Sequence, residues 1–204
     1  DGTAGLPANV RWLDVAELNE SVDDLAMTLS ARWRARPAST TAVLGVSGHG
    51  EFSVDIARDG PHALVAGTTG SGKSALLQAL VASLAVANRP DELTCVLVDY
   101  KGGAAFGAWG ALPHTVGLVT DLDGVLAERA LASLTAELKR RESLFATARV
   151  TDIAAYRTAG GHLARLVIVV DEFASLAEEL PEFVGGLVGI AQRGRSLGVH
   201  LVLA

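Results

Sequence analysis

The sequence predicts an α/β fold in which a mainly parallel sheet is flanked by helices. From residue 62 onward, short apolar runs alternate with segments long enough for helices, which is the order of a βαβ architecture. The run Leu166-Val167-Ile168-Val169-Val170 has no polar interruption, as expected for a strand buried on both faces. The chain has 204 residues, of which 50% are hydrophobic, and its mean hydropathy is +0.34. This length and composition suit one domain with a sizeable core.

The first 40 residues predict an N-terminal extension that contains one helix. Ser21 and Asp24 form a start that resembles a capping box, and apolar residues then recur at helical spacing. We expect this helix over residues 21–34, and Pro37 prevents it from continuing.

Strands and helices alternate through the rest of the chain. Two apolar runs on either side of the turn at 47–50 predict a β-hairpin over 42–46 and 52–56. The remaining elements, in chain order, are expected at strand 62–66, helix 74–87, strand 93–99, strand 115–120, helices 123–148 and 152–158, strand 166–171, a helical stretch to about 197, and strand 199–204. Residues 41–204 therefore form the predicted main domain. Because an apolar strand closes the sequence, we expect this chain to be a fragment of a longer protein.

A phosphate-binding loop is predicted at Gly67-Thr68-Thr69-Gly70-Ser71-Gly72-Lys73-Ser74, which matches the pattern G-x-x-x-x-G-K-[ST] at every defined position. The glycines allow backbone conformations in which successive N–H groups converge on a phosphate. Lys73 can reach the β- and γ-phosphates, and the Ser74 hydroxyl can ligate Mg²⁺. The loop lies between a predicted strand and a predicted helix N-terminus, which favours anions. We therefore predict that residues 67–74 and the following Ala75 bind a nucleotide.

A second motif is the apolar run 166–170 followed by Asp171 and Glu172. An apolar strand that ends in a carboxylate is the Walker B pattern, in which the aspartate holds Mg²⁺ through the water shell of the ion. The adjacent Glu172 can polarise a water molecule for in-line attack on the γ-phosphate. A solvated Asp-Glu turn is the alternative for this motif by itself, but the phosphate-binding loop upstream favours the metal site.

Asp99 ends another predicted strand and is a third carboxylate at the same sheet edge. Ligands of open parallel sheets lie outside the carboxyl ends of the strands, so Asp99 should join Ser74 and Asp171 in one crevice. We therefore predict Asp99 as a nucleotide-binding residue and Lys101 as a candidate for phosphate contact. A purely structural turn after this strand is the alternative.

Charge and composition narrow the functional classes. The net charge is -6 and the pI is about 5.3, so the chain lacks the general basic footprint of a nucleic-acid-binding domain. No apolar run approaches the roughly 20 residues of a membrane span, and the first 30 residues lack the pattern of a signal peptide. The five histidines show no metal-ligand spacing, and a single cysteine, Cys95, excludes a disulfide framework. We therefore expect a cytoplasmic location.

Five segments resemble the FtsK/SpoIIIE family of ring ATPases: 67–74, 97–106, 112–114, 169–173 and 194–204. Within the family, the form Asp99-Tyr-Lys-Gly-Gly-Ala104 and the form Gly194-Arg-Ser-Leu-Gly-Val-His200 look most like the EccC/EssC ATPases of type VII secretion. DNA translocases of the family usually carry an Asp-Pro-Lys version of the first form. The resemblance covers about residues 40–204.

The resemblance implies a RecA-like P-loop NTPase core, ATP and Mg²⁺ as ligands, and assembly as a homo-oligomeric ring or as tandem ATPase domains. It also implies the cytoplasmic part of a membrane-anchored machine that moves a secreted protein or double-stranded DNA. By position, Lys73 and Ser74 bind phosphate and metal, Asp171 holds the metal, and Glu172 is the catalytic glutamate. Such rings often take a transition-state arginine from a neighbouring subunit. The candidates here are Arg129, Arg140, Arg141, Arg193 and Arg195.

Three functions therefore remain as hypotheses. A motor ATPase domain for protein export is favoured by the segment Asp99–Phe106 and by the acidic charge balance. A double-stranded DNA translocase motor would need a basic channel surface and salt-sensitive duplex binding. A non-hydrolysing, nucleotide-binding assembly module is disfavoured by Glu172, which such a module would not need.

Overall fold

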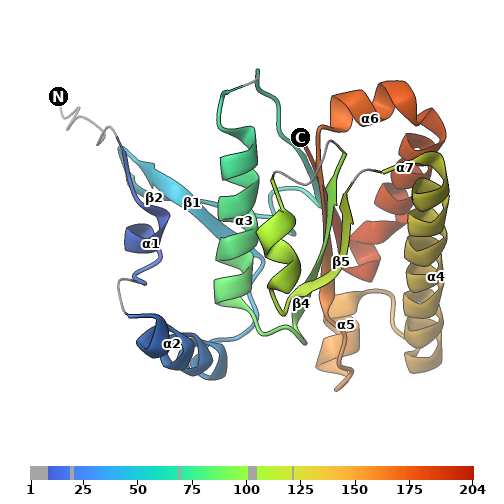
Figure 1. Cartoon of the computed structure of the whole chain (residues 1–204). Coiled ribbons are helices and arrows are strands. Elements are labelled where there is room, and N and C mark those ends of the chain that lie inside the picture. Colours follow the sequence, from blue (N-terminus) through green and yellow to red (C-terminus); the bar gives the residue numbers. More distant parts are fainter. Residues whose placement is uncertain (1–8, 19–20, 69, 101–104, 121) are drawn as a thin grey trace.

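The computed structural model describes residues 9–18, 21–68, 70–100, 105–120 and 122–204, and it places them in an α/β fold. Five strands form one sheet in which every neighbouring pair is parallel (Figure 1). In sheet order they are β3 (His62–Leu64), β7 (Val199–Leu203), β6 (Arg165–Asp171), β4 (Leu93–Asp99) and β5 (Thr115–Thr120). The predicted parallel sheet is confirmed, and β4 and β5 have the predicted bounds.

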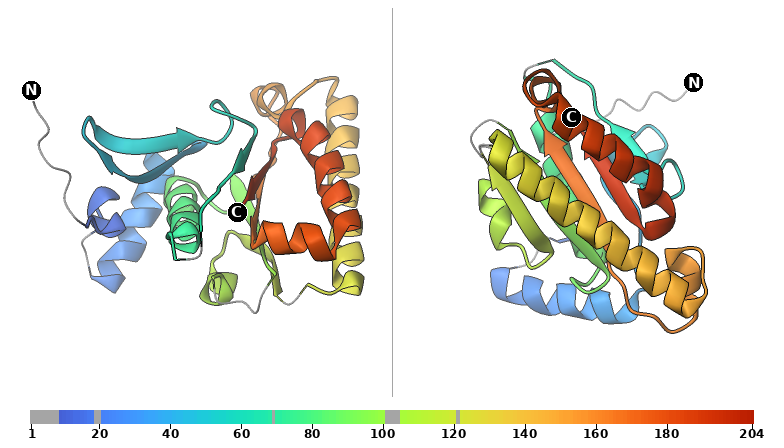
Figure 2. Two further views of the ribbon diagram at one scale, coloured as in Figure 1. Left: turned by 90° about the horizontal axis from the view of Figure 1, so that it is seen from above. Right: turned by 90° about the vertical axis from the view of Figure 1, so that its right-hand side faces the viewer.

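Helices cover both faces of this sheet, as the view from above shows (Figure 2). One face carries α3 (Lys73–Ala87), and the other carries α4 (Gly124–Ala148), α6 (Phe173–Glu179) and α7 (Pro181–Leu197). The short helix α5 (Ile153–Thr158) precedes β6, and the 3₁₀ helix η1 (Gly107–Ala111) precedes β5. In the part of the chain that the structure describes, no helix has the length and apolarity to span a bilayer.

An N-terminal layer packs outside α3. It consists of α1 (Trp12–Val15), α2 (Val22–Ala35) and a separate antiparallel hairpin of β1 (Thr41–Ser47) and β2 (Gly50–Asp55). Two tryptophans fasten this layer to its neighbours: the indole N–H of Trp12 donates to Val43 O at 3.0 Å, and that of Trp33 donates to Ala85 O at 3.1 Å. Helix α1 therefore packs against β1, and α2 packs against the end of α3. Strand β1 in turn packs against α3.

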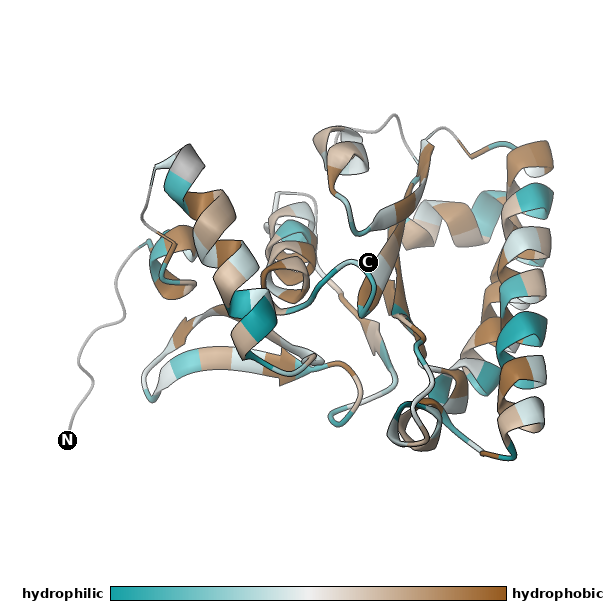
Figure 3. Ribbon diagram, turned by 90° about the horizontal axis from the view of Figure 1, so that it is seen from below, coloured by the Kyte–Doolittle hydropathy of each residue, from teal (hydrophilic) through white to brown (hydrophobic). Residues whose placement is uncertain are grey.

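The strands divide the apolar core into two layers. On β6, Val167 and Val169 pack with α3 and the hairpin, whereas Ile168 and Val170 pack with α4 and α7. Period-two alternation in a strand causes this division, and burial of both faces explains why every residue of β6 between Arg165 and Asp171 is apolar. Figure 3 shows the mainly apolar strands between helices in which hydrophilic and hydrophobic residues alternate.

The clearest differences between the structure and the predicted elements lie in four places. The helical stretch expected to run to about 197 is two helices, because Leu180 leaves the helical region (φ -129°, ψ 63°) and Pro181 starts α7. A residue before proline is driven from the α region, while proline suits the first position of a helix. The strand expected at 62–66 has only three residues in β3. The single turns α1 and η1 were not predicted, since four or five residues carry too little periodic signal.

Candidate nucleotide-binding site

The predicted phosphate-binding loop connects the carboxyl end of β3 to α3, at the upper edge of the sheet in Figure 1. Gly70 and Gly72 have positive φ angles of 78° and 91°, conformations that favour glycine. A side chain at Gly67 would collide with Ser71. The path of the chain therefore requires glycine at Gly70 and Gly72, and a side chain at Gly67 would have to displace the Ser71 hydroxyl. Thr69, also predicted to bind nucleotide, lies outside the described residues.

The helix N-terminus directly follows this loop. Lys73 is the first residue of α3, followed by Ser74 and Ala75, and among the described residues no side chain caps the helix at Gly72. An uncapped N-terminus leaves backbone N–H groups and the positive end of the macrodipole for an anion. The exposed residues Gly67, Thr68, Gly70, Ser71 and Gly72 leave this end open to a ligand.

A hydrogen bond joins the two predicted motifs. The Ser74 hydroxyl donates to Asp171 Oδ2 at 2.8 Å, although the residues are 97 positions apart. Asp171 is buried at the end of β6, and its Oδ1 accepts the Glu172 N–H at 2.9 Å. Mg²⁺ prefers oxygen ligands and is usually held by one or two protein oxygens together with waters and phosphate oxygens. Ser74 and Asp171 therefore fit a Mg²⁺ ion that is shared with a bound nucleotide.

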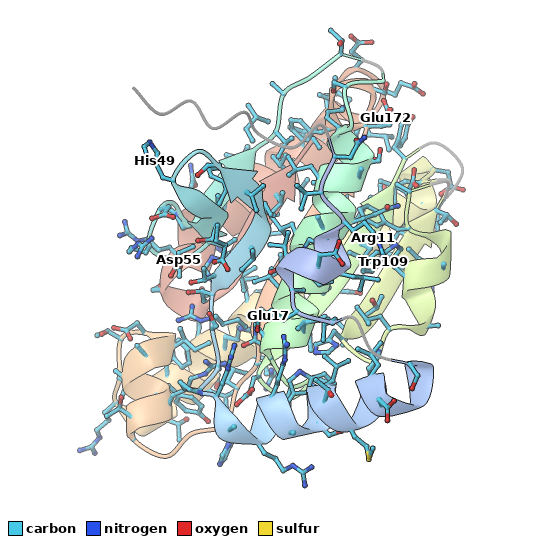
Figure 4. All side chains as sticks on the ribbon, turned by 90° about the vertical axis from the view of Figure 1, so that its left-hand side faces the viewer. Arg11, Glu17, His49, Asp55, Trp109 and Glu172 are labelled. Carbon is cyan, nitrogen blue, oxygen red and sulfur yellow. The ribbon has the colours of Figure 1, made fainter. Side chains whose placement is uncertain are left out.

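Glu172 has an unusual backbone conformation for its residue type. Its φ is 60° and its ψ is 35°, in the left-handed region, and its side chain is exposed. Figure 4 labels Glu172 at the end of the molecule where α3 begins. A non-glycine residue in this region costs about 1–3 kcal/mol, and such strain concentrates at functional sites. This conformation turns the chain from the end of β6 into α6, so Glu172 lies directly after Asp171 and outside the strand.

Asp99 lies at the same edge of the sheet, and its carboxylate accepts a hydrogen bond from the segment that follows β4. It is paired in register with Asp171 on the adjacent strand, and it is 3% exposed. Its Oδ2 accepts the Ala105 N–H at 2.9 Å. The predicted convergence of Asp99 with Ser74 and Asp171 on one edge agrees with this register, while its contact with nucleotide stays a prediction. Lys101 lies outside the described residues.

The five candidate arginines have different surroundings. Arg141 is 2% exposed and donates to Leu197 O at 2.9 Å, so it cannot extend to a neighbouring subunit. Arg140 forms a two-point ion pair with Glu137, and Arg193 lies 3.5 Å from Glu142. Arg129 and Arg195 are exposed and form no ion pair with a described carboxylate, so they stay candidates.

Sequence reasoning missed Gln78. Its Nε2 donates to Ala105 O at 2.7 Å, so it connects α3 to the segment that follows β4. The sequence did contain a signal for Gln78. From Ser74 to Ser83, Gln78 is the only polar residue within a run of Leu, Ala and Val, and it lies four residues after Ser74. Residues four apart share a helix face, so Gln78 faces the same way as Ser74.

Comparison with known proteins gives the family of the chain. The model of the FtsK/SpoIIIE family matches residues 25–165, which is more than half of the chain. The chain belongs to the FtsK/SpoIIIE family. The expected resemblance to EccC and EssC is also confirmed. The type VII secretion system protein EssC of Staphylococcus aureus (strain Mu50) is 41% identical over 210 residues, which cover 98% of this chain.

Solved structures give the same relationship for the fold. The cytoplasmic domain of the type VII secretion ATPase EccC of Thermomonospora curvata is 34% identical, with a TM-score of 0.86 over 97% of this chain and 25% of that one. EccC ATPases 2 and 3 of that organism, in complex with a signal sequence peptide, are 27% identical, with a TM-score of 0.72 over 84% of this chain and 33% of that one. The chain spans only 14% of the length of the S. aureus relative.

Proposed function

We propose that this chain is a motor domain of a type VII secretion-like ATPase, which binds ATP and hydrolyses it in a Mg²⁺-dependent reaction coupled to protein export. The observation that carries the proposal is the 2.8 Å hydrogen bond from Ser74 to Asp171, beside the backbone of Glu172. It brings the phosphate-binding loop and the carboxylates of β6 to one edge of the sheet. Membership of the FtsK/SpoIIIE family supports this assignment.

Each residue of the site has a chemical role in this proposal. The N–H groups after Gly72 and the ammonium of Lys73 bind the phosphates, and Ser74 and Asp171 hold Mg²⁺. When bound, the metal neutralises charge on the β- and γ-phosphates. Glu172 orients a water molecule and accepts its proton as that water attacks the γ-phosphorus; ADP leaves with the bridging oxygen, and the products are ADP and inorganic phosphate.

The export of a protein is favoured over the movement of DNA by the relatives and by charge. EssC is named as a secretion system protein, and the EccC structure with a signal sequence peptide shows that an EccC domain binds a peptide. The net charge of -6 provides little attraction for a duplex. We further propose that the domain works on the cytoplasmic side of a membrane-anchored complex, beside other ATPase domains or as a ring.

Two substitutions in the full-length protein test the site. Lys73→Ala removes the cationic partner of the phosphates, so we expect ATP affinity to fall about tenfold or more in a calorimetric titration. Glu172→Gln keeps the side-chain shape but removes the base, so turnover should fall about a hundredfold or more while ATP still binds. Unchanged ATP affinity in Lys73→Ala would contradict the site. Full turnover in Glu172→Gln would contradict its catalytic role.

Duplex DNA provides the test of what is moved. We expect ATP turnover to be the same with and without DNA at low and at moderate salt. Stimulation by DNA that fades as salt increases would instead indicate a DNA translocase, because phosphate contacts weaken with salt. ATP binding without turnover in the wild-type protein would indicate an assembly module.

A further inference from the structure

A second hydrogen-bonded connection joins α3 to the sheet, one helical turn beyond Ser74. Gln78 Nε2 donates to Ala105 O at 2.7 Å, and the Ala105 N–H donates to Asp99 Oδ2 at 2.9 Å. Both polar groups of one peptide segment are therefore held by side chains from two different elements. We call Gln78, Ala105 and Asp99 the Ala105 bridge.

The middle of the Ala105 bridge is fixed by burial. Ala105 is 8% exposed, and the adjacent Phe106 has no exposed surface. Phe106 belongs to the same core layer as Leu77 of α3 and Leu97 of β4. The bridge is therefore anchored to a packed core, and a shift of Gln78 relative to Asp99 would disturb that packing.

The Ala105 bridge and the predicted metal site share their supports. Asp99 is paired in register with Asp171, so the two carboxylates leave neighbouring strands at the same level. Ser74 bonds to Asp171, and Gln78 lies on the same face of α3 as Ser74. A closed path therefore runs from Ser74 through Asp171, the paired strands and the bridge back to α3.

This path matters because the core contacts of α3 with the sheet, in which Leu77 and Leu80 share a layer with Val169 of β6, are apolar and therefore non-directional. The helix packs against β1, and the Ser83 hydroxyl accepts the Val43 N–H at 2.6 Å. The Ser83 hydrogen bond holds the helix to the hairpin, whereas the apolar contacts with β6 do not fix its position along the strand that carries Asp171. The Ala105 bridge restrains α3 on the side that faces the carboxyl ends of the strands.

We propose that Gln78 is a positioning residue for the metal-bound nucleotide. Through Ala105 and Asp99 it holds the start of α3 at the distance from β6 at which Ser74 and Asp171 can share one ion. Mg²⁺ requires ligand distances of about 2.0–2.1 Å, so a displacement of a few tenths of an ångström weakens it. The inference rests on the proposed function, in which Ser74 and Asp171 hold Mg²⁺.

Gln78→Met in the full-length protein tests the proposal, because methionine is of similar length and helix propensity but has no donor. The measured quantity is the Mg²⁺ concentration at which binding of a fluorescent ATP analogue is half-maximal. We expect it to increase about tenfold, as for loss of other groups that orient metal ligands. Gln192→Met, on the exposed side of α7, is the matched control and should leave the midpoint unchanged.

A double variant separates positioning from general loss of structure. If Gln78 acts through Ser74, Gln78→Met should change the Mg²⁺ midpoint less than about twofold in a Ser74→Ala background. An equal effect in both backgrounds, or no effect in the single variant, would overturn the proposal. A merely structural role would lower the amount of bound analogue without moving the midpoint.

The binding measurement also separates this proposal from the proposed function. If the wild-type protein binds the analogue in a Mg²⁺-dependent way but does not turn over ATP, only the proposed hydrolysis is contradicted. The Mg²⁺ midpoint of Gln78→Met still tests the positioning role of Gln78. If wild-type binding is independent of Mg²⁺, the metal site is contradicted, and the positioning role of Gln78 is overturned with it.

Discussion

Two consecutive arginines on α4 show how burial gives identical side chains different roles. Arg140 and Arg141 both bond to Glu137, but the Arg140 side chain is 53% exposed and that of Arg141 is 3% exposed. Arg141 also donates to Leu197 O at the end of α7, where it satisfies a carbonyl that lacks a partner within the helix. Burial lowers the pKa of the Arg141 guanidinium, and the bond to Glu137 opposes that shift. Arg141 therefore fastens α4 to α7 and is not available to a neighbouring subunit.

The two arginines make a matched pair for a stability test. We expect Arg141→Met to lower the free energy of unfolding by about 3 kcal/mol, because it leaves the buried Leu197 O unpaired and removes a partly buried ion pair with Glu137. Arg140→Met should lower it by less than about 1 kcal/mol, since the lost pair is exposed. Denaturant unfolding of both variants measures the difference, and equal losses would contradict the structural role of Arg141.

The close approach of helix α7 to strand β7 determines which residue can occupy position 194. Gly194 is buried, and a Cβ there would lie 2.7 Å from the Val199 carbonyl oxygen on β7. Backbone atoms cannot rotate away as a flexible side chain can, so glycine is needed for α7 to pack this closely on the sheet. Gly185 in the same helix is exposed, and a Cβ there would meet nothing within 4 Å.

These two glycines should therefore respond oppositely to the same change. We expect Gly194→Ala to lower the free energy of unfolding by about 1–3 kcal/mol, because the helix must move away from β7. Gly185→Ala should raise it by about 0.5–1 kcal/mol, because alanine loses less conformational freedom than glycine when a helix forms. Thermal or denaturant unfolding checks both, and a stabilised Gly194→Ala would show that α7 does not pack this closely.

The stability of the whole molecule depends on a buried histidine on β7. The His200 Nδ1–H donates to Pro61 O at 3.0 Å, and its Nε2 accepts from Arg165 Nη1 at 3.3 Å. This arrangement requires the neutral ring and connects the approach to β3 with β7 and β6. Burial lowers the pKa of His200 to about 4, and the nearby Arg165, His62 and Arg141 add to that shift, while the Pro61 carbonyl opposes it.

Acid should therefore destabilise the fold through His200. In the unfolded chain this histidine is protonated below about pH 6.5, whereas in the folded chain it stays neutral until about pH 4. Protons therefore bind preferentially to the unfolded chain, and the free energy of unfolding falls as the pH falls through this window. We expect the contribution to decrease by about 2 kcal/mol between pH 7 and pH 5. In urea unfolding, the free energy of unfolding of His200→Gln should therefore change between pH 7 and pH 5 by about 2 kcal/mol less than that of the wild type. His49→Gln, at the exposed hairpin tip, is the control, and identical slopes for all three proteins would contradict the role of His200.

The sequence by itself determined the parallel α/β fold and the two motifs of the site. Leucine-, valine- and isoleucine-rich strands, the glycines of residues 67–72 and the carboxylates after β6 are local patterns, and each depends on neighbours in the chain. The position of Asp99 at the same sheet edge as Asp171 also followed from the rule that parallel strands bring their carboxyl ends to one edge, whereas their pairing in register is a finding of the structure.

Only the tertiary structure decided how isolated polar residues are used. Gln78, Arg141 and His200 each have partners at least 27 positions away in sequence, so no local pattern could assign them a role. The break between α6 and α7 was readable from Pro181, but the need for glycine at Gly194 depends on the approach of β7. Local backbone preference therefore specified the elements, whereas the pairing of buried polar groups was decided by which elements the fold brings together.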